Sequence, residues 1–263
     1  MKKIAAFLLV LLISTNLTGC CCIPTSLPFF NKNDKVAVAE MPETNVDLQE
    51  EVTEEPVRDT KATVTISRVD RSIKNSEGEV LIEHFYDQVF VTGNFEGAAK
   101  INATLMADMT EFFNLHTDLQ EMIPYIDRNY GGFFSTRAAE VTRNEGSLLC
   151  IEYASEWCMG GVHNGDIYPF VFDLNTGETP SLSSLTGVDS DKLESALKIT
   201  IKDYLYSDYD GEGVGYIDDY SLDDFNYTIR DGKICIVFET YEIACGAAGS
   251  IIVPTDFYAV SMQ

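Results

Sequence analysis

The sequence predicts an α+β fold, in which a largely antiparallel sheet carries two long helices packed on it. Two observations support this prediction. Short stretches in which apolar and polar residues alternate, as they do in strands, come in pairs separated by turns. Two longer stretches, with apolar residues three or four positions apart as in helices, interrupt these pairs. Paired strands favour antiparallel neighbours, and helices set apart from them favour α+β over a regularly alternating α/β fold.

The first predicted elements are two strands and a helix. Order begins near Thr63, where Val64 and Ile66 alternate with polar residues, and a second strand covers residues 80–91 after a turn at 75–78. A helix is predicted within residues 96–119. Its apolar positions recur at steps of four, four and three, and they are Ile101, Leu105, Met109 and Phe112.

The second half is predicted to contain three strands, a helix and two further strands. Three strands are predicted at 133–142, 147–153 and 167–174. A helix follows at 191–205, with Asp191 and Glu194 spaced as in a capping box. The last two strands are predicted at 233–240 and 250–260.

The N-terminus has the pattern of a bacterial lipoprotein signal. Lys2 and Lys3 precede an apolar run at 4–13 that is too short to cross a bilayer, which needs about 20 apolar residues. Leu17-Thr18-Gly19 then stands directly before Cys20. We therefore predict a signal peptide at 1–19, lipidation of Cys20 with acyl chains such as palmitate, and an extracytoplasmic protein anchored to the cell membrane. An ordinary cleaved signal and a short membrane anchor are the alternatives.

Residues 20–60 have the composition of a tether, since they show no hydrophobic period, carry four prolines and are strongly acidic. The whole chain has 42 acidic and 18 basic residues, for a net charge of −24, and loss of Lys2 and Lys3 with the signal changes −24 to −26. Such a charge repels nucleic acid, so no nucleic-acid partner is expected, and it attracts cationic partners. Solubility alone is the alternative explanation.

Four cysteines lie beyond the anchor region. In an extracytoplasmic protein an even number indicates disulfides first. Cys150 and Cys235 lie in apolar strand-like runs, while Cys158 and Cys245 follow in glycine-bearing loops. The parallel order favours Cys150–Cys235 and Cys158–Cys245, one of three possible connectivities. A metal site is the rival interpretation, although no C-x-x-C or H-x-x-x-H spacing supports it.

The stretch Glu156–Asp166 is the first candidate site, because it combines the only tryptophan with a histidine, an aspartate and three glycines. We predict that it forms one loop between strands, where recognition residues concentrate. Trp157 is the best anchor candidate, with a core tryptophan as the alternative. His163 with Asp166 could exchange protons, but no nucleophile or second carboxylate is placed beside them, so we do not expect an enzyme.

A calcium loop is the second candidate. Its acidic residues and one glycine fall at positions one, three, five, six and twelve of an EF-hand register, and these are Asp208, Asp210, Glu212, Gly213 and Asp219. Position twelve, however, normally holds the longer glutamate. An acidic solvated loop is the alternative, and no cofactor other than this possible Ca²⁺ is expected.

Three separate stretches in the same order resemble a known family. They are Gly160–Gly165, Tyr168–Glu178 and Tyr241–Gly249. The chain resembles the extracytoplasmic, lysozyme-binding domain of RsiV-type anti-sigma factors and the N-terminal region of PdaC-type peptidoglycan deacetylases. This resemblance divides the chain into a PdaC N-terminal-like domain at 61–165 and an RsiV C-terminal-like domain at 166–263. It implies an α+β binding module of the envelope.

The chain also departs from that family. It shows no transmembrane helix, no cytoplasmic anti-sigma segment and no deacetylase domain, and it carries Cys158 and Cys245 inside two of the shared stretches.

The leading functional hypothesis is a non-catalytic, lipid-anchored binding module for a cationic protein such as lysozyme or for a wall glycan. The predicted ligand-binding residues come from two loops, and they are Trp157, Gly160, Gly161, His163, Asn164, Asp166, Tyr241, Ile243 and Gly246. The alternatives are an envelope hydrolase that acts on peptidoglycan and a purely structural tethered domain. A second carboxylate or a nucleophile within hydrogen-bond reach of His163, in a cleft, would favour the hydrolase.

Overall fold

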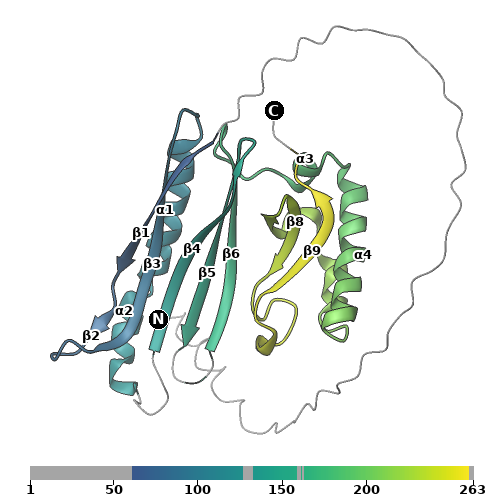
Figure 1. The fold of residues 1–263 in the computed structure, drawn as a ribbon. Coiled ribbons are helices and arrows are strands. Elements are labelled where there is room, and N and C mark those ends of the chain that lie inside the picture. The colour runs from purple at the N-terminus through teal and green to yellow at the C-terminus, as the bar shows by residue number, and fades with distance from the viewer. Residues whose placement is uncertain (1–60, 127–132, 159–160, 162, 261–263) are drawn as a thin grey trace, which may run out of the picture. The chain divides into compact units, whose positions relative to one another are not determined.

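The computed structural model describes residues 61–126, 133–158, 161 and 163–260, which all lie in one compact unit (Figure 1). It confirms the α+β fold with mainly antiparallel strands. The prediction of one sheet is wrong, because the described strands form two separate sheets. Alternation within single strands predicts strands but does not reveal which of them pair, and pairing decides how many sheets form.

The large sheet contains the first six strands. They are β1 (Thr63–Asp70), β2 (Ile73–Lys74), β3 (Val80–Thr92), β4 (Phe133–Glu145), β5 (Leu148–Cys158) and β6 (His163–Asp173). The order is β1-β3-β4-β5-β6, and β2 pairs with β3. Every pair is antiparallel except β3 with β4. That pair is parallel because a helical crossover connects its two strands.

The crossover contains α1 (Ala98–Asn114), α2 (His116–Met122) and a 3-10 turn, η2 (Ile123–Tyr125). The predicted single helix is therefore two helices that meet at Leu115. α1 packs on one face of the large sheet, where its buried residues Ile101, Leu105 and Phe112 join the core around Tyr86 and Ile151.

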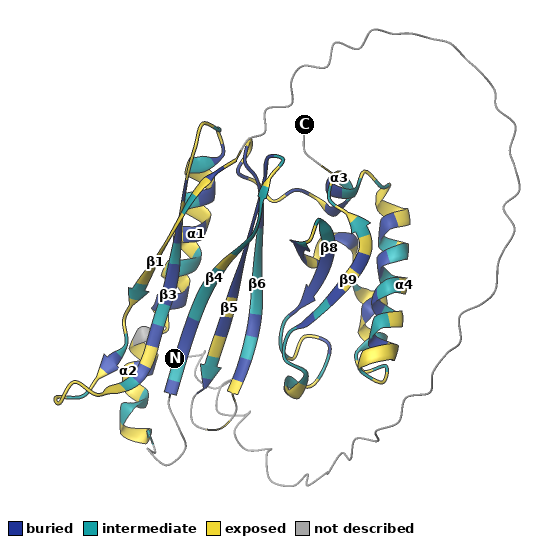
Figure 2. Ribbon diagram, in the orientation of Figure 1, coloured by how far each residue is buried: buried dark blue, intermediate teal, exposed yellow. Residues whose placement is uncertain are grey.

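β5 is the central buried strand of the molecule. Leu149, Ile151 and Tyr153 face the core under α1, whereas Leu148 and Cys150 belong to a second core. The strand is buried on both faces from Leu148 to Tyr153, as the dark ribbon in Figure 2 shows. This explains why its sequence is a nearly continuous apolar run.

The second core lies between the small sheet and α4 (Ser190–Asp208). The small sheet consists of β7 (Asn226–Arg230), β8 (Lys233–Phe238) and β9 (Ile251–Tyr258), in that order. Four leucine or isoleucine side chains of α4 are buried, and they are Leu193, Leu197, Ile201 and Leu205. β7 was not predicted, because a five-residue strand shows little alternation.

Shorter elements complete this half: α3 (Leu182–Thr186) and the 3-10 turns η4 (Val214–Asp219), η5 (Leu222–Asp224) and η6 (Gly246–Ala248). The N-cap of α4 also differs from the predicted one. The N-cap is Asp189, whose side chain accepts from the backbone N–H of Lys192, rather than a capping box that starts at Asp191. The predicted domain boundary between 165 and 166 falls inside β6, which pairs with β5 along its whole length.

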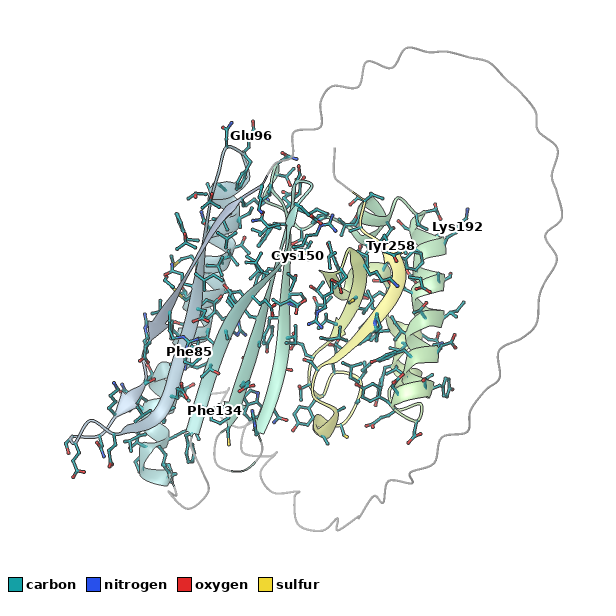
Figure 3. The ribbon with its side chains drawn as sticks, in the orientation of Figure 1. Phe85, Glu96, Phe134, Cys150, Lys192 and Tyr258 are labelled. Carbon is teal, nitrogen blue, oxygen red and sulfur yellow. The ribbon has the colours of Figure 1, made fainter. Side chains whose placement is uncertain are left out.

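The two sheets contact each other where β7 of the small sheet lies against β4, β5 and β6 of the large sheet. Glu152 on β5 accepts hydrogen bonds from Thr228 Oγ1 at 2.7 Å and Arg230 Nε at 2.8 Å, both on β7. Cys150, labelled in Figure 3, lies in the core of the same region, two residues before Glu152 on β5. An ion pair between the buried Glu152 and the partly exposed Arg230 thus joins the sheets beside apolar contacts.

Candidate functional site

Most of the stretch predicted as one loop, Glu156–Asp166, is β-structure. β5 continues to Cys158 and β6 begins at His163, so that Trp157 pairs with Asn164 and with Ser135 of β4. The loop prediction was wrong because the three glycines indicated a loop, whereas the residues before and after them pair as strands. Trp157 is half-buried and Gly161 is exposed, while Gly160 lies outside the described residues.

The structure brings the two predicted regions together. The Asp166 carboxylate on β6 accepts the backbone N–H of Thr240 at 2.6 Å, and the Thr240 hydroxyl donates to the Gly165 carbonyl at 2.8 Å. Ser250 Oγ accepts the N–H of Ile167 at 3.0 Å. The segment 239–250 therefore covers the edge of β6, whose backbone groups would otherwise be open to pairing with other chains.

Tyr241 follows Thr240 in a conformation that bulky residues rarely adopt. Its φ is +72°, and its side chain is 58% exposed. The ring lies against Gly246, where any Cβ would overlap it, so Gly246 is needed for this close approach. Asn164 Nδ2 lies 3.5 Å from Tyr241 Oη. Such strain persists only where surrounding contacts impose it, and it is concentrated at functional sites.

The predicted binding residues divide into exposed and buried groups. His163 and Tyr241 are exposed. Asn164 is 3% and Asp166 9% exposed, so both are buried beneath the segment that contains Tyr241 and are not available to contact a ligand directly. The prediction that Ile243 contacts a ligand is wrong, because its side chain is 3% exposed and belongs to the second core. Its position next to a tyrosine and glycines gave no sign of this burial.

Among the residues that the structure describes, no carboxylate lies within hydrogen-bond reach of His163. Its Nε2 lies 3.8 Å from Glu156 Oε2, beyond hydrogen-bond reach, and both side chains are 59% exposed. Its ring contacts the edge of Phe134, which Figure 3 labels, with centroids 5.0 Å apart. Asp166, the proposed partner, is occupied by Thr240.

The acidic loop supports the Tyr241 segment. The four predicted calcium ligands Asp208, Asp210, Glu212 and Asp219 are all described, yet no group of three or more His, Cys, Asp or Glu side chains in the described part of the chain could hold a metal ion. Glu212 instead accepts the backbone N–H of Cys245 at 2.7 Å. Sequence reasoning missed this role because the two segments are far apart in the chain.

These contacts define a group of exposed residues, which we call the Tyr241 surface. It consists of the side chains of Glu212, Tyr241, Glu242 and Cys245. His163 and Glu156 lie on the face of β6 and β5 opposite to the Asn164 side chain that contacts Tyr241, so they are not part of it. The two carboxylates of the Tyr241 surface give it a negative charge beside one exposed aromatic ring.

A cluster of ionisable groups lies behind this surface. Burial first, and then the charges of Asp166 and Glu242, raise the pKa of Glu239, and Arg137 offsets part of this effect. Burial likewise raises the pKa of Tyr168, with the charges of Asp166 and Glu239 adding to it. Arg137 itself contacts the Tyr168 ring at 4.0 Å and pairs with Asp108 at 2.7 Å.

The two predicted disulfides are not present. Cys150, Cys158, Cys235 and Cys245 are all free thiols, the first three buried and the last exposed. Cys150 lies among the apolar side chains of the second core, whereas Cys235 points to the Glu152–Arg230 pair, whose charges influence it. Exposed Cys245 lies beside Glu212, with the sulfur 3.9 Å from its carboxylate.

The lipidation site Cys20 and the tether lie outside the described residues. Within the part that the structure describes, no helix combines the length and the apolar character needed to cross a membrane.

Comparison with protein-family models and with curated proteins gives no match. Among solved structures, the chain is similar to a member of the DUF3298 family, a domain of unknown function, from Bacteroides fragilis. The TM-score is 0.50 at 13% identity, over 78% of this chain and 96% of that chain. A DUF3298 family protein from Pseudomonas aeruginosa PAO1 gives a TM-score of 0.48 at 12% identity, over 74% and 89%. At 13% identity the first likeness shows a shared fold.

Proposed function

We propose that this chain is a non-catalytic binding module whose Tyr241 surface recognises a cationic protein such as lysozyme. The observation that carries the proposal is the strained, exposed Tyr241, which follows the hydrogen-bonded Thr240, lies against Gly246 and is followed in the chain by the exposed Glu242. A rigid aromatic ring can bury a large area on binding while losing little conformational entropy. The neighbouring negative charge favours a partner rich in lysine and arginine.

The sequence resemblance to RsiV-type and PdaC-type extracytoplasmic domains supports the same function. Two of the three shared stretches, Gly160–Gly165 and Tyr241–Gly249, meet at this surface through Asn164, Gly165, Thr240 and Tyr241. The third, Tyr168–Glu178, ends in a turn at 173–178 that packs against the start of α1 and serves as scaffold.

A hydrolase is the weaker candidate. General acid–base chemistry needs a partner within about 3.2 Å of His163, in a site that excludes water. Glu156 lies 3.8 Å away, and both groups are largely exposed.

We test binding with hen egg-white lysozyme as the probe, by surface plasmon resonance on the immobilised protein. Tyr241→Ala should weaken binding by about 30-fold, which corresponds to about 2 kcal/mol, mainly through faster dissociation. Tyr258→Ala is the matched control, because Tyr258 is 59% exposed but lies on β9, outside this surface. Equal effects of the two substitutions, or no binding of lysozyme by the parent protein, would contradict the proposal.

The contribution of charge to the association rate is measured separately. Replacement of Glu212 and Glu242 by glutamine should slow association with lysozyme at low salt and change it little at high salt, because screening shortens to about 8 Å at physiological ionic strength. An association rate that does not depend on salt would argue against a cationic partner and leave a neutral wall glycan as the candidate.

We further propose that lipid on Cys20 anchors the module outside the cytoplasm. Cys20→Ser should move the protein from the membrane fraction to the soluble fraction and abolish labelling by a fatty-acid probe. Since the tether separates Cys20 from the folded part in sequence, the melting temperature should not change. Labelling that persists in the variant would contradict lipidation at Cys20.

A further inference from the structure

The two edge strands of the large sheet differ in how their backbone groups are covered. At β6, the segment 239–250 covers the edge through hydrogen bonds made by Thr240 and Ser250. At the other edge, β1 pairs with β3 alone among the strands that the structure describes. Because unpaired N–H and C=O groups of an edge strand are a template for another strand, β1 is the edge at which a further chain can be added.

The register shows which backbone groups of β1 point away from β3. The Arg71 N–H donates to the His84 carbonyl at 2.8 Å, in the same register as the eight pairs of β1 with β3. In an antiparallel ladder, hydrogen-bonded and non-hydrogen-bonded pairs alternate along the strand. The N–H and C=O groups that point outward therefore belong to every second residue, and these are Val64, Ile66, Arg68 and Asp70.

β1 lacks most of the features that protect natural edge strands. It has eight residues, pairs with β3 without a shift of register, and contains neither proline nor lysine. Most of its residues are β-branched, and the side chain of Ile66 is 43% exposed. Asn144 closes the beginning of the strand, since its side chain bonds both the N–H and the carbonyl of Ala62 at 3.0 and 2.8 Å. The open edge therefore starts at Val64.

The charges of β1 complement those of a second, antiparallel β1. Arg68 and Asp70 are the charged residues of the strand, and both are exposed. In an antiparallel pair centred on Val69, Arg68 lies opposite Asp70 of the second copy, and two-fold symmetry repeats this pair. Opposite charges in directly facing positions stabilise a sheet, whereas like charges destabilise it. The edge thus matches its own copy in charge.

We propose that β1 is a dimerisation edge, to which a second copy of this chain adds its own β1 in antiparallel orientation. One sheet then continues through both molecules. The proposal goes beyond the proposed function and does not involve the Tyr241 surface. The net charge of −24 opposes self-association, so added salt should strengthen the dimer. This is the opposite of the salt effect expected for lysozyme.

Sedimentation equilibrium tests the proposal on the full chain with Cys20, Cys21 and Cys22 replaced by serine. We expect a monomer–dimer equilibrium that is stronger at about 0.5 M than at about 0.05 M salt. Ile66→Lys should raise the dissociation constant at least about tenfold, because lysine on an edge strand blocks pairing. Ile199→Lys is the matched control, since Ile199 is 62% exposed on α4.

Two further measurements test the pairing itself. Asp70→Arg should weaken the dimer because it places arginine opposite Arg68 of the second copy, whereas Asp256→Arg, on exposed β9, should not. Hydrogen exchange at increasing protein concentration should show new protection of the Ile66 and Arg68 amides, while the Ser67 amide, which faces β3, should change little.

Thermal melting checks that each variant is folded. The proposal is overturned if the parent protein stays monomeric at about 0.5 mM in both salts, where even a dimer of millimolar dissociation constant would be detected. It is also overturned if Ile66→Lys dimerises like the parent, or if a dimer forms without new protection of the β1 amides. Because no ligand is used, these results do not depend on whether the protein binds lysozyme.

Discussion

At the scale of single residues, burial decides the role of each polar side chain. Glu152 is 5% exposed, yet it lies in the apolar run of β5, and it is accommodated because Arg230 binds it with two nitrogens and Thr228 donates a third hydrogen bond. A buried carboxylate without such partners would be strongly unfavourable.

Arg230→Met should therefore destabilise the fold, by about 3 kcal/mol, because it leaves Glu152 buried without its charge partner. Lys233→Met is the matched control. Its partner Asp256 is fully exposed, so the loss should be much smaller than for Arg230→Met. Urea denaturation measures both. Equal losses would mean that the burial of Glu152 does not matter for stability.

The cysteines give a second prediction at this scale. In a chain with Cys20, Cys21 and Cys22 replaced by serine, we expect one thiol, Cys245, to react quickly with Ellman's reagent in the native state, since it is the exposed one. Cys150 should react only on unfolding, because burial raises its pKa to about 12. Cys245→Ser should remove the fast phase.

The same assay tests the disulfide prediction. If Cys158 pairs with Cys245 in the secreted protein, the fast phase is absent until a reductant is added. Four thiols in denaturant without a reductant would agree with the free cysteines of the structure.

At the scale of elements, the turn after β6 fixes the start of α1. The Asp173 side chain accepts the N–H of Asn175 at 2.9 Å, and Gly177 has φ +70°. A Cβ on Gly177 would overlap the backbone of Gly97, the residue that caps α1. The Asn175-Thr176-Gly177 sequence thus joins the helix to the edge of the large sheet.

Gly177→Ala should cost about 3 kcal/mol, the sum of a left-handed backbone without glycine and the overlap with Gly97. Gly187→Ala is the control, because Gly187 has a similar φ of +67° but open space around its Cβ, and it should cost only about 1 kcal/mol. Thermal and urea denaturation compare the two. Similar losses would show that backbone strain alone matters at both sites.

At the scale of the whole molecule, the net charge of −24 makes stability depend on pH. Burial raises the pKa of Glu239, so its ionised carboxylate lowers the free energy of unfolding at neutral pH. This loss of stability is recovered as the pH falls through the raised pKa. Several exposed or half-buried carboxylates have lowered pKa values through hydrogen bonds, and these are Asp70, Glu178, Glu194, Asp218 and Asp224. Their contribution is present at neutral pH and is lost in stronger acid.

The melting temperature should therefore rise as the pH is lowered from 7 to about 5 and should fall below about pH 4, the ordinary pKa of carboxyl groups. Differential scanning calorimetry at constant ionic strength measures this profile. Glu239→Gln should melt higher than the parent at pH 7, and the difference should shrink as the pH falls. A melting temperature that falls steadily from pH 7 downward would contradict the expected balance of charges.

The sequence by itself determined the class of fold and most elements. Strands β1 and β3 and helix α4 were predicted to within a few residues, because alternation and helical spacing are local properties of the chain. It also led to the hypothesis that Gly160–Gly165 and Tyr241–Gly249 contribute to one binding site, which stays a prediction. These features depend on neighbours in the sequence, which are visible without a structure.

Only the tertiary structure decided how these parts meet. Two sheets form instead of one, Glu212 supports Cys245, and Asp166 holds Thr240 from 74 positions away. Ile243 is buried while the nearby Tyr241 is exposed, because the second core and the edge of β6 surround them differently. Long-range pairing and burial are set by contacts between distant segments, and no local pattern of residue types carries that information.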